Sequence, residues 1–236
     1  MAERKYKNVS AFILAGGASS RMGCPKGFIE FGGKPLILRT AQLVEPLVSS
    51  VTVIGPARPY RRLGLSAIPD RIPGVAQVPA FQGPLAGILT ALGASESRWN
   101  LILACDLPYL TQEWIEALLM RAQGSGAQAC LPRTSDGLEP LAAVYRLDAH
   151  DKLAEAFREG VRKVTDALQR VSVATVALEE FGGFPDGGLV LKNMNTPADL
   201  SAARKWWKAK SGMSVEATRS LQGRSKKTRR ALRLNK

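Results

Sequence analysis

A glycine-rich segment near the N-terminus combines the parts of a phosphate-binding loop. Glycine lets the backbone approach a ligand closely and direct its N–H groups at anionic oxygens. Arg21 and Lys26 add positive charge, while Ser19 and Ser20 add hydroxyl donors. The spacing matches neither a Walker loop nor a Gly-x-Gly-x-x-Gly fingerprint, so we predict a phosphate cradle of another type. A plain turn with solvated charges is the alternative. The segment reads Leu14-Ala15-Gly16-Gly17-Ala18-Ser19-Ser20-Arg21-Met22-Gly23-Cys24-Pro25-Lys26.

A carboxylate follows a strongly apolar run in the middle of the chain. Asp106 comes directly after residues 101–105, which read Leu-Ile-Leu-Ala-Cys. A carboxylate in this position can hold Mg²⁺, a hard ion that prefers one or two carboxylates together with phosphate oxygens. The alternative role for Asp106 is to cap the next turn through its side chain.

Two further groups combine polar side chains with the start of a helix. Asp70 is followed by Gly-Pro-Leu-Ala-Gly at 83–87, and free N–H groups at such a helix start suit an anion or the polar edge of a nucleotide. Asn193 and Asn195 stand just before Thr196-Pro197, where capping of a helix explains part of the pattern. Ordinary loop punctuation is the alternative for the first group.

The periodicity of apolar residues predicts strands alternating with helices, which is typical of a mainly parallel α/β sheet. Predicted strands cover 9–15, 51–54, 101–105, 127–131, 141–145 and 171–178. Predicted helices cover 35–48, 84–94, a segment capped by Thr111, 148–159, 162–168 and a segment from 196 toward Trp207. An open α/β sheet binds ligands beyond the carboxyl ends of its strands. The glycine-rich segment and Asp106 are both expected at that edge.

Composition excludes several classes of protein. The chain has 236 residues, of which 45% are apolar and 22% charged, as is ordinary for a globular protein. Its three cysteines have no paired spacing, which argues against a disulfide framework or a zinc ribbon. No apolar run approaches the roughly 18 residues of a membrane span, and no signal peptide follows the charged N-terminus. The single histidine, His150, has no nucleophile to pair with, so acyl transfer is disfavoured.

Positive charge is concentrated at the C-terminal end. Residues 208–236 hold ten of the 33 Lys and Arg residues but only one of the 20 acidic residues. The other residues are nearly balanced in charge, so the net charge of +13 belongs mostly to this tail. We expect one α/β domain over 1–207 and a basic, flexible tail over 208–236. A tail of this kind either binds nucleic acid through phosphate neutralisation or is a solvated extension without a specific partner.

The ordered set of motifs resembles the molybdenum cofactor guanylyltransferases, which belong to the MobA-like nucleotidyltransferases. The set comprises the pattern at 14–26, Asp70 with Gly-Pro-Leu-Ala-Gly-Ile at 83–88, Cys-Asp-Leu-Pro-Tyr-Leu at 105–110 and Asn-x-Asn-Thr-Pro at 193–197. Many sugar-phosphate nucleotidyltransferases share the opening motif, whereas the ordered set is more specific. The resemblance covers about residues 8–205 and implies a Rossmann-like, three-layer α/β/α (GT-A-like) fold with a mainly parallel sheet.

The resemblance also implies roles for individual residues. Lys26, Arg21 and Asp106 would be catalytic, and Asp106 would also bind Mg²⁺. Asn193 and Asn195 would lie toward the acceptor. The residues implied to bind the nucleotide or the acceptor are Leu14, Ala15, Gly16, Gly17, Lys26, Asp70, Gly83, Asp106, Asn193 and Asn195. This chain departs from the family in having no polar side chain at Gly55-Pro56 and in carrying the basic tail.

The activity implied by the resemblance is the transfer of GMP from GTP to the terminal phosphate of molybdopterin, with release of pyrophosphate. An ionised phosphate attacks without a general base, which agrees with the lack of a usable histidine. A molybdopterin cytidylyltransferase is one alternative, although its opening usually reads Leu-Ala-Ala-Gly rather than the Leu-Ala-Gly-Gly found at 14–17. A sugar-phosphate nucleotidyltransferase is another. A non-enzymatic nucleotide-binding or nucleic-acid-binding protein acting through its tail is the third.

The partners implied by the resemblance are small molecules and other proteins of cofactor biosynthesis. GTP and molybdopterin are the expected substrates, and a carrier or molybdenum-inserting protein is a further expected partner. We expect no membrane association, disfavour nucleic acid as a partner, and expect the protein in the cytoplasm.

Overall fold

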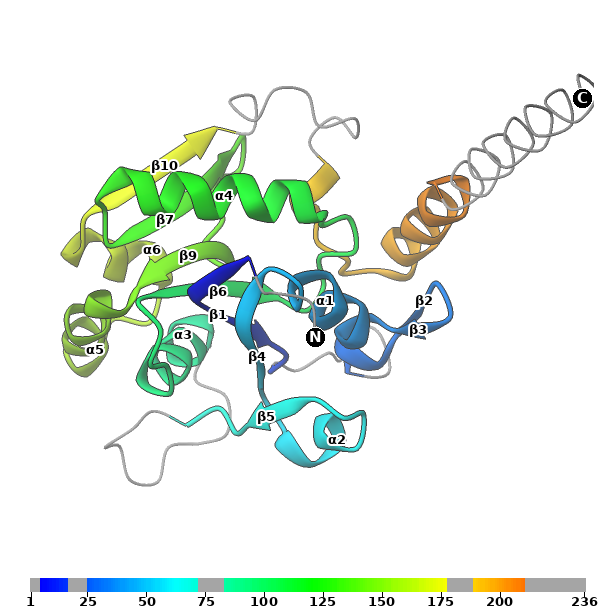
Figure 1. Ribbon diagram of the computed structural model, residues 1–236, viewed down its shortest axis with the longest axis horizontal. Helices are drawn as coiled ribbons and strands as arrows, with labels where there is room; N and C mark the ends of the chain where they lie inside the picture. The colour runs from blue at the N-terminus through cyan, green and yellow to red at the C-terminus, as the bar shows by residue number, and fades with distance from the viewer. Residues whose placement is uncertain (1–4, 17–24, 72–82, 178–188, 211–236) are drawn as a thin grey trace, which may run out of the picture.

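The computed structural model describes residues 5–16, 25–71, 83–177 and 189–210. Its centre is a mainly parallel sheet with the strand order β10-β7-β9-β6-β1-β4-β5, and β8 pairs with β7 (Figure 1). The parallel pairs are β1 with β4 and β6, β4 with β5, and β7 with β10, whereas β9 runs antiparallel to β6 and β7. The predicted sheet is therefore confirmed. The strands are β1 Tyr6–Leu14, β4 Val48–Ile54, β5 Ser66–Ile68, β6 Trp99–Ala104, β7 Ala129–Thr134, β8 Gly137–Leu138, β9 Ala142–Arg146 and β10 Val173–Ala177.

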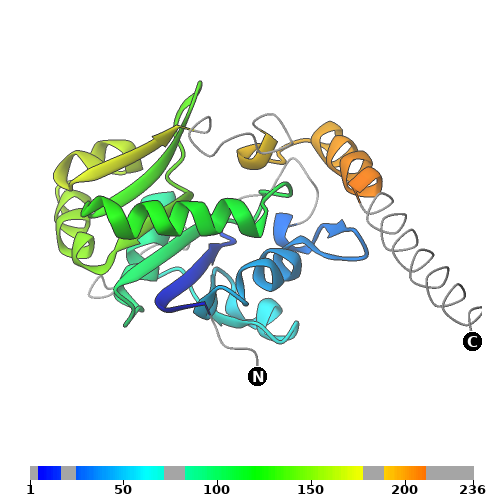
Figure 2. The ribbon, with the colours of Figure 1, turned by 45° about the horizontal axis from the view of Figure 1, so that its top comes forward.

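Helices cover both faces of the sheet, which gives the expected three layers. On one face α1 and α4 pack against the strands, and on the other face α3 and α5 do so (Figures 1 and 2). Alternate residues of β1 explain the arrangement, because Val9 and Ala11 belong to the first core and Phe12 to the second. The helices are α1 Leu36–Val44, α2 Ala57–Arg61, α3 Pro84–Gly93, α4 Gln112–Ser125, α5 His150–Arg158, α6 Val164–Ala167 and a helix over 197–210.

Local signals set the helix ends close to the predicted positions. The Thr111 hydroxyl accepts a hydrogen bond of 3.3 Å from the N–H of Trp114, which caps α4. Gly126, with φ of 68°, ends the same helix. Pro84 opens α3 after Gly83, whose φ is 86°. The helix predicted over 35–48 is shorter, because α1 ends at Val44 and residues from 48 onward join the sheet.

Four short strands and one short α-helix were not predicted. A hairpin joins β2 (Glu30–Phe31) to β3 (Lys34–Pro35), and two glycines with φ of 60° and 79° form its turn. The helix α2, the strand β5 and the small strand β8 are the others. Each is five residues or fewer, which is too short to carry a hydrophobic period.

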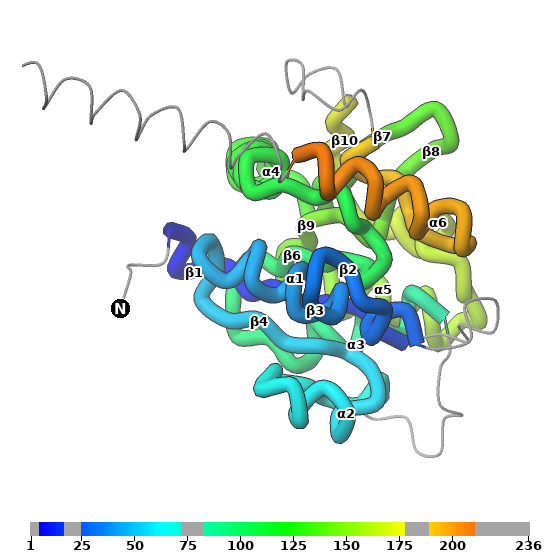
Figure 3. The backbone as a smooth tube through the Cα atoms, turned by 90° about the vertical axis from the view of Figure 1, so that its right-hand side faces the viewer, coloured from blue at the N-terminus to red at the C-terminus, as the bar shows by residue number. Residues whose placement is uncertain are grey.

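The helix over 197–210 lies beside the β2–β3 hairpin (Figure 3). Arg204 Nη2 donates a hydrogen bond of 2.8 Å to the carbonyl oxygen of Glu30, and the rings of Phe31 and Trp207 are 5.9 Å apart. The domain boundary expected at 207/208 falls inside this helix, and the rest of the tail, 211–236, lies outside the described residues. No helix in the described part of the chain has the length and apolar character to cross a membrane.

Candidate active site

Three parallel strands end together at one edge of the sheet. Beyond β1 and β4, the N–H of Ala15 donates to the carbonyl of Ile54 at 2.9 Å, and the N–H of Cys105 donates to that of Leu14 at 3.2 Å. These bonds bring the backbone after β1 alongside the backbone after β6. A β-carbon at Gly55 would lie 3.2 Å from the carbonyl carbon and oxygen of Ala15. The close approach explains why no polar side chain stands at position 55.

A cluster of three side chains forms at this edge from distant parts of the sequence. Lys26 Nζ donates a hydrogen bond of 2.6 Å to Asp106 Oδ2 and a second one to Asn195 Oδ1. The side chains of Lys26 and Asp106 are only 20% and 14% exposed, so the ion pair is largely shielded from water. Within the described residues, Asp106 Oδ1 has no hydrogen-bond partner. One carboxylate oxygen thus remains available to a ligand.

Asn195 is placed by the turn that precedes the C-terminal helix. Asp199 Oδ2 accepts hydrogen bonds from the N–H of Asn195 (3.1 Å), the N–H of Thr196 (2.9 Å) and the hydroxyl of Thr196 (2.8 Å). These bonds lower the pKa of Asp199, so it stays ionised. Met194 is fully buried, and its N–H donates to the carbonyl of Asp106 at 2.9 Å. The turn is therefore fastened directly to the end of β6.

A pocket of about 440 Å³, here called the Leu14 pocket, lies between the end of β1 and the start of α3. A β-carbon at Gly87 would lie 3.1 Å from the Leu14 side chain, so α3 approaches β1 closely. In the wall, Asp70 Oδ1 accepts a hydrogen bond of 3.2 Å from Thr90, and burial raises the pKa of Asp70 while this bond opposes the rise. The pocket is lined by Leu14, Ala15, Gly16, Lys26, Ile54, Asp70, Gly83, Pro84, Gly87, Ala104, Cys105, Asp106 and Leu141.

A second pocket of about 420 Å³, here called the Lys163 pocket, shares the Asp106 wall with the first. The Lys163 ammonium has no hydrogen-bond or ion-pair partner among the residues that the structure describes. Arg162, by contrast, donates to the carbonyls of Phe157 and Val161 at 2.7 and 3.0 Å. Burial, with the nearby Asp136, raises the pKa of Glu139. The lining consists of Pro84, Ala104, Asp106, Leu107, Leu138, Glu139, Pro140, Leu141, Ala142, Arg162, Lys163, Val164, Thr165, Asn193 and Asn195.

The structure brings together every predicted site residue that it describes. Gly17 and Arg21 lie outside the described residues. His150 lies at the opposite end of the sheet, with Nδ1 3.0 Å from Asp151 Oδ1, and lines neither pocket. The residues in the two pockets are Leu14, Ala15, Gly16, Lys26, Asp70, Gly83 and Asp106 in the first, and Asp106, Asn193 and Asn195 in the second.

Sequence reasoning missed Lys163, Glu139 and Thr90. Lys163 follows Arg162 in a run of charged residues that reads as a solvated surface, and Thr90 lies inside an apolar helix. The sequence around Lys163 and Thr90 therefore carries no local signal of a binding site. Only the packing of α3 and of the segment before α6 against the sheet edge reveals them.

The side chains around Lys26 suit a divalent cation that is shared with a phosphate. The ammonium contacts one carboxylate oxygen and one amide oxygen, and both are hard donors. No group of three or more His, Cys, Asp or Glu gathers among the described residues. A cation at this position would therefore take Asp106 from the protein and its remaining ligands from substrate and water, as Mg²⁺ commonly does.

Comparison with known structures gives the same fold. The chain is similar to the crystal structure of molybdopterin-guanine dinucleotide biosynthesis protein A from Archaeoglobus fulgidus, with a TM-score of 0.71 and 27% identity, covering 85% of this chain and 99% of that one. It is also similar to 2-C-methyl-D-erythritol 4-phosphate cytidylyltransferase from Thermus thermophilus, with a TM-score of 0.61. That protein is 17% identical, and the match covers 84% of this chain and 98% of that one, so it shows the fold alone.

Comparison with known sequences identifies the family. A probable molybdenum cofactor guanylyltransferase from Pelotomaculum thermopropionicum is 35% identical over 193 residues, or 81% of this chain and 90% of that protein. One from a Nostoc species is 36% identical over 201 residues, or 82% of this chain and 89% of that protein. Residues 11–172 match the MobA-like NTP transferase domain. The chain therefore belongs to the MobA-like NTP transferase family and is a nucleotidyltransferase.

Proposed function

We propose that this protein transfers GMP from GTP to the terminal phosphate of molybdopterin, forming the guanine dinucleotide cofactor and pyrophosphate. The observation that carries the proposal is the shared wall of the two pockets, where Asp106 stands beside Lys26 and Asn195. A transferase needs two substrates that meet at one reacting atom, and this arrangement supplies two pockets that meet at one charged cluster. The names of the curated relatives support guanylyl transfer in particular.

The Leu14 pocket suits the donor nucleotide. Backbone N–H groups after β1 and Lys26 provide positive potential for the triphosphate, and the start of α3 at Gly83 adds its helix dipole. Asp70, which lines the same pocket, is suited to accept hydrogen bonds from the polar edge of the nucleoside. We assign Leu14, Ala15 and Gly16 to the guanine and ribose end, and Lys26 to the phosphates, with Arg21 and the N–H groups of the loop that contains Gly17 assisting.

The Lys163 pocket suits the acceptor. Its apolar residues provide a surface for a flat pterin ring. The ammonium of Lys163, which has no partner in the described part of the chain, can bind the terminal phosphate. Asn193 and Asn195 line the side nearest Asp106. A phosphate held between Lys163 and Asn195 would face the donor pocket.

The reaction needs positioning and charge neutralisation more than proton transfer. An oxygen of the ionised acceptor phosphate attacks the α-phosphorus of GTP, the new O–P bond forms, and the bond to the β-phosphate oxygen breaks to release pyrophosphate. A phosphate monoester is largely dianionic at neutral pH, since its second pKa is about 6, and no base is required. Lys26 and Arg21 stabilise the charge that develops on the α-phosphate.

We assign Mg²⁺ to Asp106, with Asn195 beside it. When bound, the ion neutralises phosphate charge and orients the leaving pyrophosphate. Lys26 leaves Asp106 for the phosphates when the nucleotide enters, because a triphosphate offers the ammonium more negative charge than one carboxylate does. The side chain needs only to swing between two neighbouring anionic partners.

Nucleotide preference is the sharpest test of the proposal. The unfolding temperature would be measured with GTP, CTP, ATP and UTP, each with and without Mg²⁺. A ligand at 100 times its dissociation constant stabilises a protein by about 2.7 kcal/mol. We expect the largest rise with GTP plus Mg²⁺. A larger rise with CTP would replace guanylyl with cytidylyl transfer, and no rise with any nucleotide would overturn the donor pocket.

We infer a cytoplasmic protein, which agrees with Cys105 being a buried free thiol. We propose that the transferase domain ends near residue 207 and that the basic tail is not required for transfer. A carrier or molybdenum-inserting protein is proposed as the recipient of the product.

A further inference from the structure

We propose that Tyr60 is a positioning residue, which holds two short segments of the nucleotide site in a fixed relation. The first segment is Ala15 and Gly16, directly after β1, and the second is Lys26–Phe28. Both must contact the same GTP molecule if the Leu14 pocket binds GTP, so the inference rests on the proposed function. Tyr60 lies on α2, outside both pockets, and nothing in the motif pattern singles it out.

Tyr60 is fully buried and stays neutral at any working pH. Burial raises its pKa to about 12, so the phenol keeps its proton and acts as a hydrogen-bond donor. The side chain belongs to the core cluster that also contains Ile13, Ile37 and Cys105. It therefore projects from α2 through the core toward the end of β1.

The hydroxyl of Tyr60 contacts the first segment. It donates a hydrogen bond of 3.3 Å to the carbonyl oxygen of Ala15. Ala15 lines the Leu14 pocket and is followed by Gly16, which lines it too. The bond fixes the direction of the peptide unit between these two residues, and hence the direction of the Gly16 N–H.

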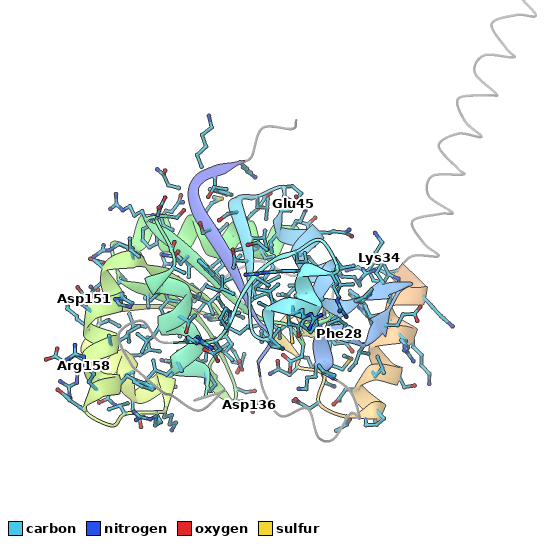
Figure 4. All side chains as sticks on the ribbon, turned by 90° about the horizontal axis from the view of Figure 1, so that it is seen from below. Phe28, Lys34, Glu45, Asp136, Asp151 and Arg158 are labelled. Carbon is cyan, nitrogen blue, oxygen red and sulfur yellow. The ribbon has the colours of Figure 1, made fainter. Side chains whose placement is uncertain are left out.

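The ring of Tyr60 contacts the second segment. It stacks on Phe28 with ring centroids 5.0 Å apart and an angle of 12° between the planes. A β-carbon at Gly27 would lie 3.2 Å from the Tyr60 hydroxyl oxygen and 3.4 Å from Cε1. Phe28 is partly buried, and in Figure 4 it lies on the side of the molecule away from Asp151 and Arg158. Residues 27 and 28 thus rest on the tyrosine ring immediately after Lys26.

Tyr145 provides a matched comparison. It is also fully buried, and its hydroxyl donates a bond of 3.0 Å to the carbonyl of Pro140. Loss of either hydroxyl should therefore affect folding to a similar extent. Only the Tyr60 hydroxyl contacts the segments that flank Lys26 in the nucleotide pocket. A difference between the two variants in nucleotide binding would separate positioning from general packing.

The first experiment compares Tyr60→Phe with Tyr145→Phe. Both changes keep the ring, so Tyr60→Phe retains the stack on Phe28 and is expected to fold. Calorimetric titration with GTP and Mg²⁺ should show about fivefold weaker binding for Tyr60→Phe, the loss expected for one neutral hydrogen bond. Binding to Tyr145→Phe should be unchanged. Equal GTP affinity in both variants would overturn the proposal.

The second experiment is a double-mutant cycle with Gly27→Ala. The new methyl meets the Tyr60 oxygen most closely, so Gly27→Ala should weaken GTP binding in the wild-type background and do so less in Tyr60→Phe. Strictly additive losses would count against the shared contact. If the wild-type protein prefers another nucleotide, the cycle is run with that nucleotide, which separates a wrong donor assignment from a wrong role for Tyr60. Failure of the wild-type protein to bind any nucleotide would overturn both.

Discussion

Two ion pairs at opposite ends of the sheet have similar distances, but they differ in how many carboxylate oxygens the cation binds. At the amino end of β6, Arg146 binds Asp148 through two parallel bonds of 2.7 Å, one to each carboxylate oxygen, and gives a third bond to the carbonyl of Gly126. At the carboxyl end, Lys26 gives Asp106 one bond of 2.6 Å and leaves the second oxygen unpartnered among the described residues. Both oxygens of Asp148 accept a bond from the arginine, whereas only one oxygen of Asp106 has a partner among the described residues.

The difference indicates which pair can exchange partners. Arg146 holds the pKa of Asp148 below its ordinary value by hydrogen bonding, and more than half of that side chain is exposed to water. Such a pair contributes at most about 1 kcal/mol to stability, and the arginine already binds both carboxylate oxygens. Asp106 lines both pockets and Lys26 lines the Leu14 pocket, so Lys26 can exchange Asp106 for a phosphate and Asp106 can exchange Lys26 for a cation. We therefore expect ligand binding at the ion pair in which one carboxylate oxygen has no protein partner among the described residues.

The largest effect is expected from Asp106→Asn. The variant keeps the shape of the side chain but loses the charge that holds Mg²⁺, and turnover should fall about a thousandfold. The matched control is Asp148→Asn, which should keep full turnover and lose at most about 1 kcal/mol of stability. Turnover and urea denaturation would be measured on both variants. Normal turnover in Asp106→Asn would remove Asp106 from the metal site.

A smaller loss is expected from Lys26→Met. Without the ammonium, turnover should fall about a hundredfold, because one charge-assisted contact to the phosphates is missing. The nucleotide-free variant should at the same time bind Mn²⁺ more tightly than the wild type, since no ammonium competes for Asp106. Paramagnetic resonance titration measures that affinity. An unchanged Mn²⁺ affinity would show that Lys26 and the cation do not share the carboxylate.

Lys163→Met should distinguish the substrate bound in the Lys163 pocket from the substrate bound in the Leu14 pocket. The KM for molybdopterin should rise about tenfold, the cost of one charged hydrogen bond, while the KM for GTP stays constant. Lys152→Met is a suitable control, because Lys152 contacts Gln128 away from both pockets. Steady-state kinetics with each substrate varied in turn gives both constants. A rise in the KM for GTP alone would reverse the assignment of donor and acceptor.

The smallest effect concerns stability, at Asp70. Burial raises the pKa of this carboxyl above its ordinary value near 3.8, so the ionised form is disfavoured in the folded protein. The wild type should lose stability as pH rises from about 4 through the raised pKa, whereas Asp70→Asn should not. Urea denaturation across this range should show the variant gaining relative to the wild type and then levelling off. A constant difference would mean that Asp70 titrates normally.

The long elements and the strand-end residues could be predicted because their signals are local. The apolar runs of β1 and β6 identify central strands, with the glycine-rich segment after β1 and Asp106 just after β6. Parallel strands share one carboxyl edge, so this segment and Asp106 were expected at the same edge. The hairpin β2–β3 and the strand β5 were missed, since two or three residues carry no period.

Contacts across the fold could not be predicted in this way. The bond from Lys26 to Asn195 joins residues 169 positions apart, and it depends on how Met194 is buried near the end of β6. Tyr60 and Lys163 reach the site through packing of α2 and of the segment before α6, and both stand in stretches that read as ordinary surface. Their positions follow from three-dimensional packing alone.

The most direct test of the account is a single-turnover experiment with GTP labelled at the α-phosphate. The protein, in excess over GTP, would be mixed with Mg²⁺ and molybdopterin, and the label would be followed by chromatography. The account predicts that the label moves into the pterin dinucleotide with one equivalent of unlabelled pyrophosphate released, and that CTP is used far less efficiently. Label that stays in GTP, or transfer that proceeds equally well with CTP, would contradict it.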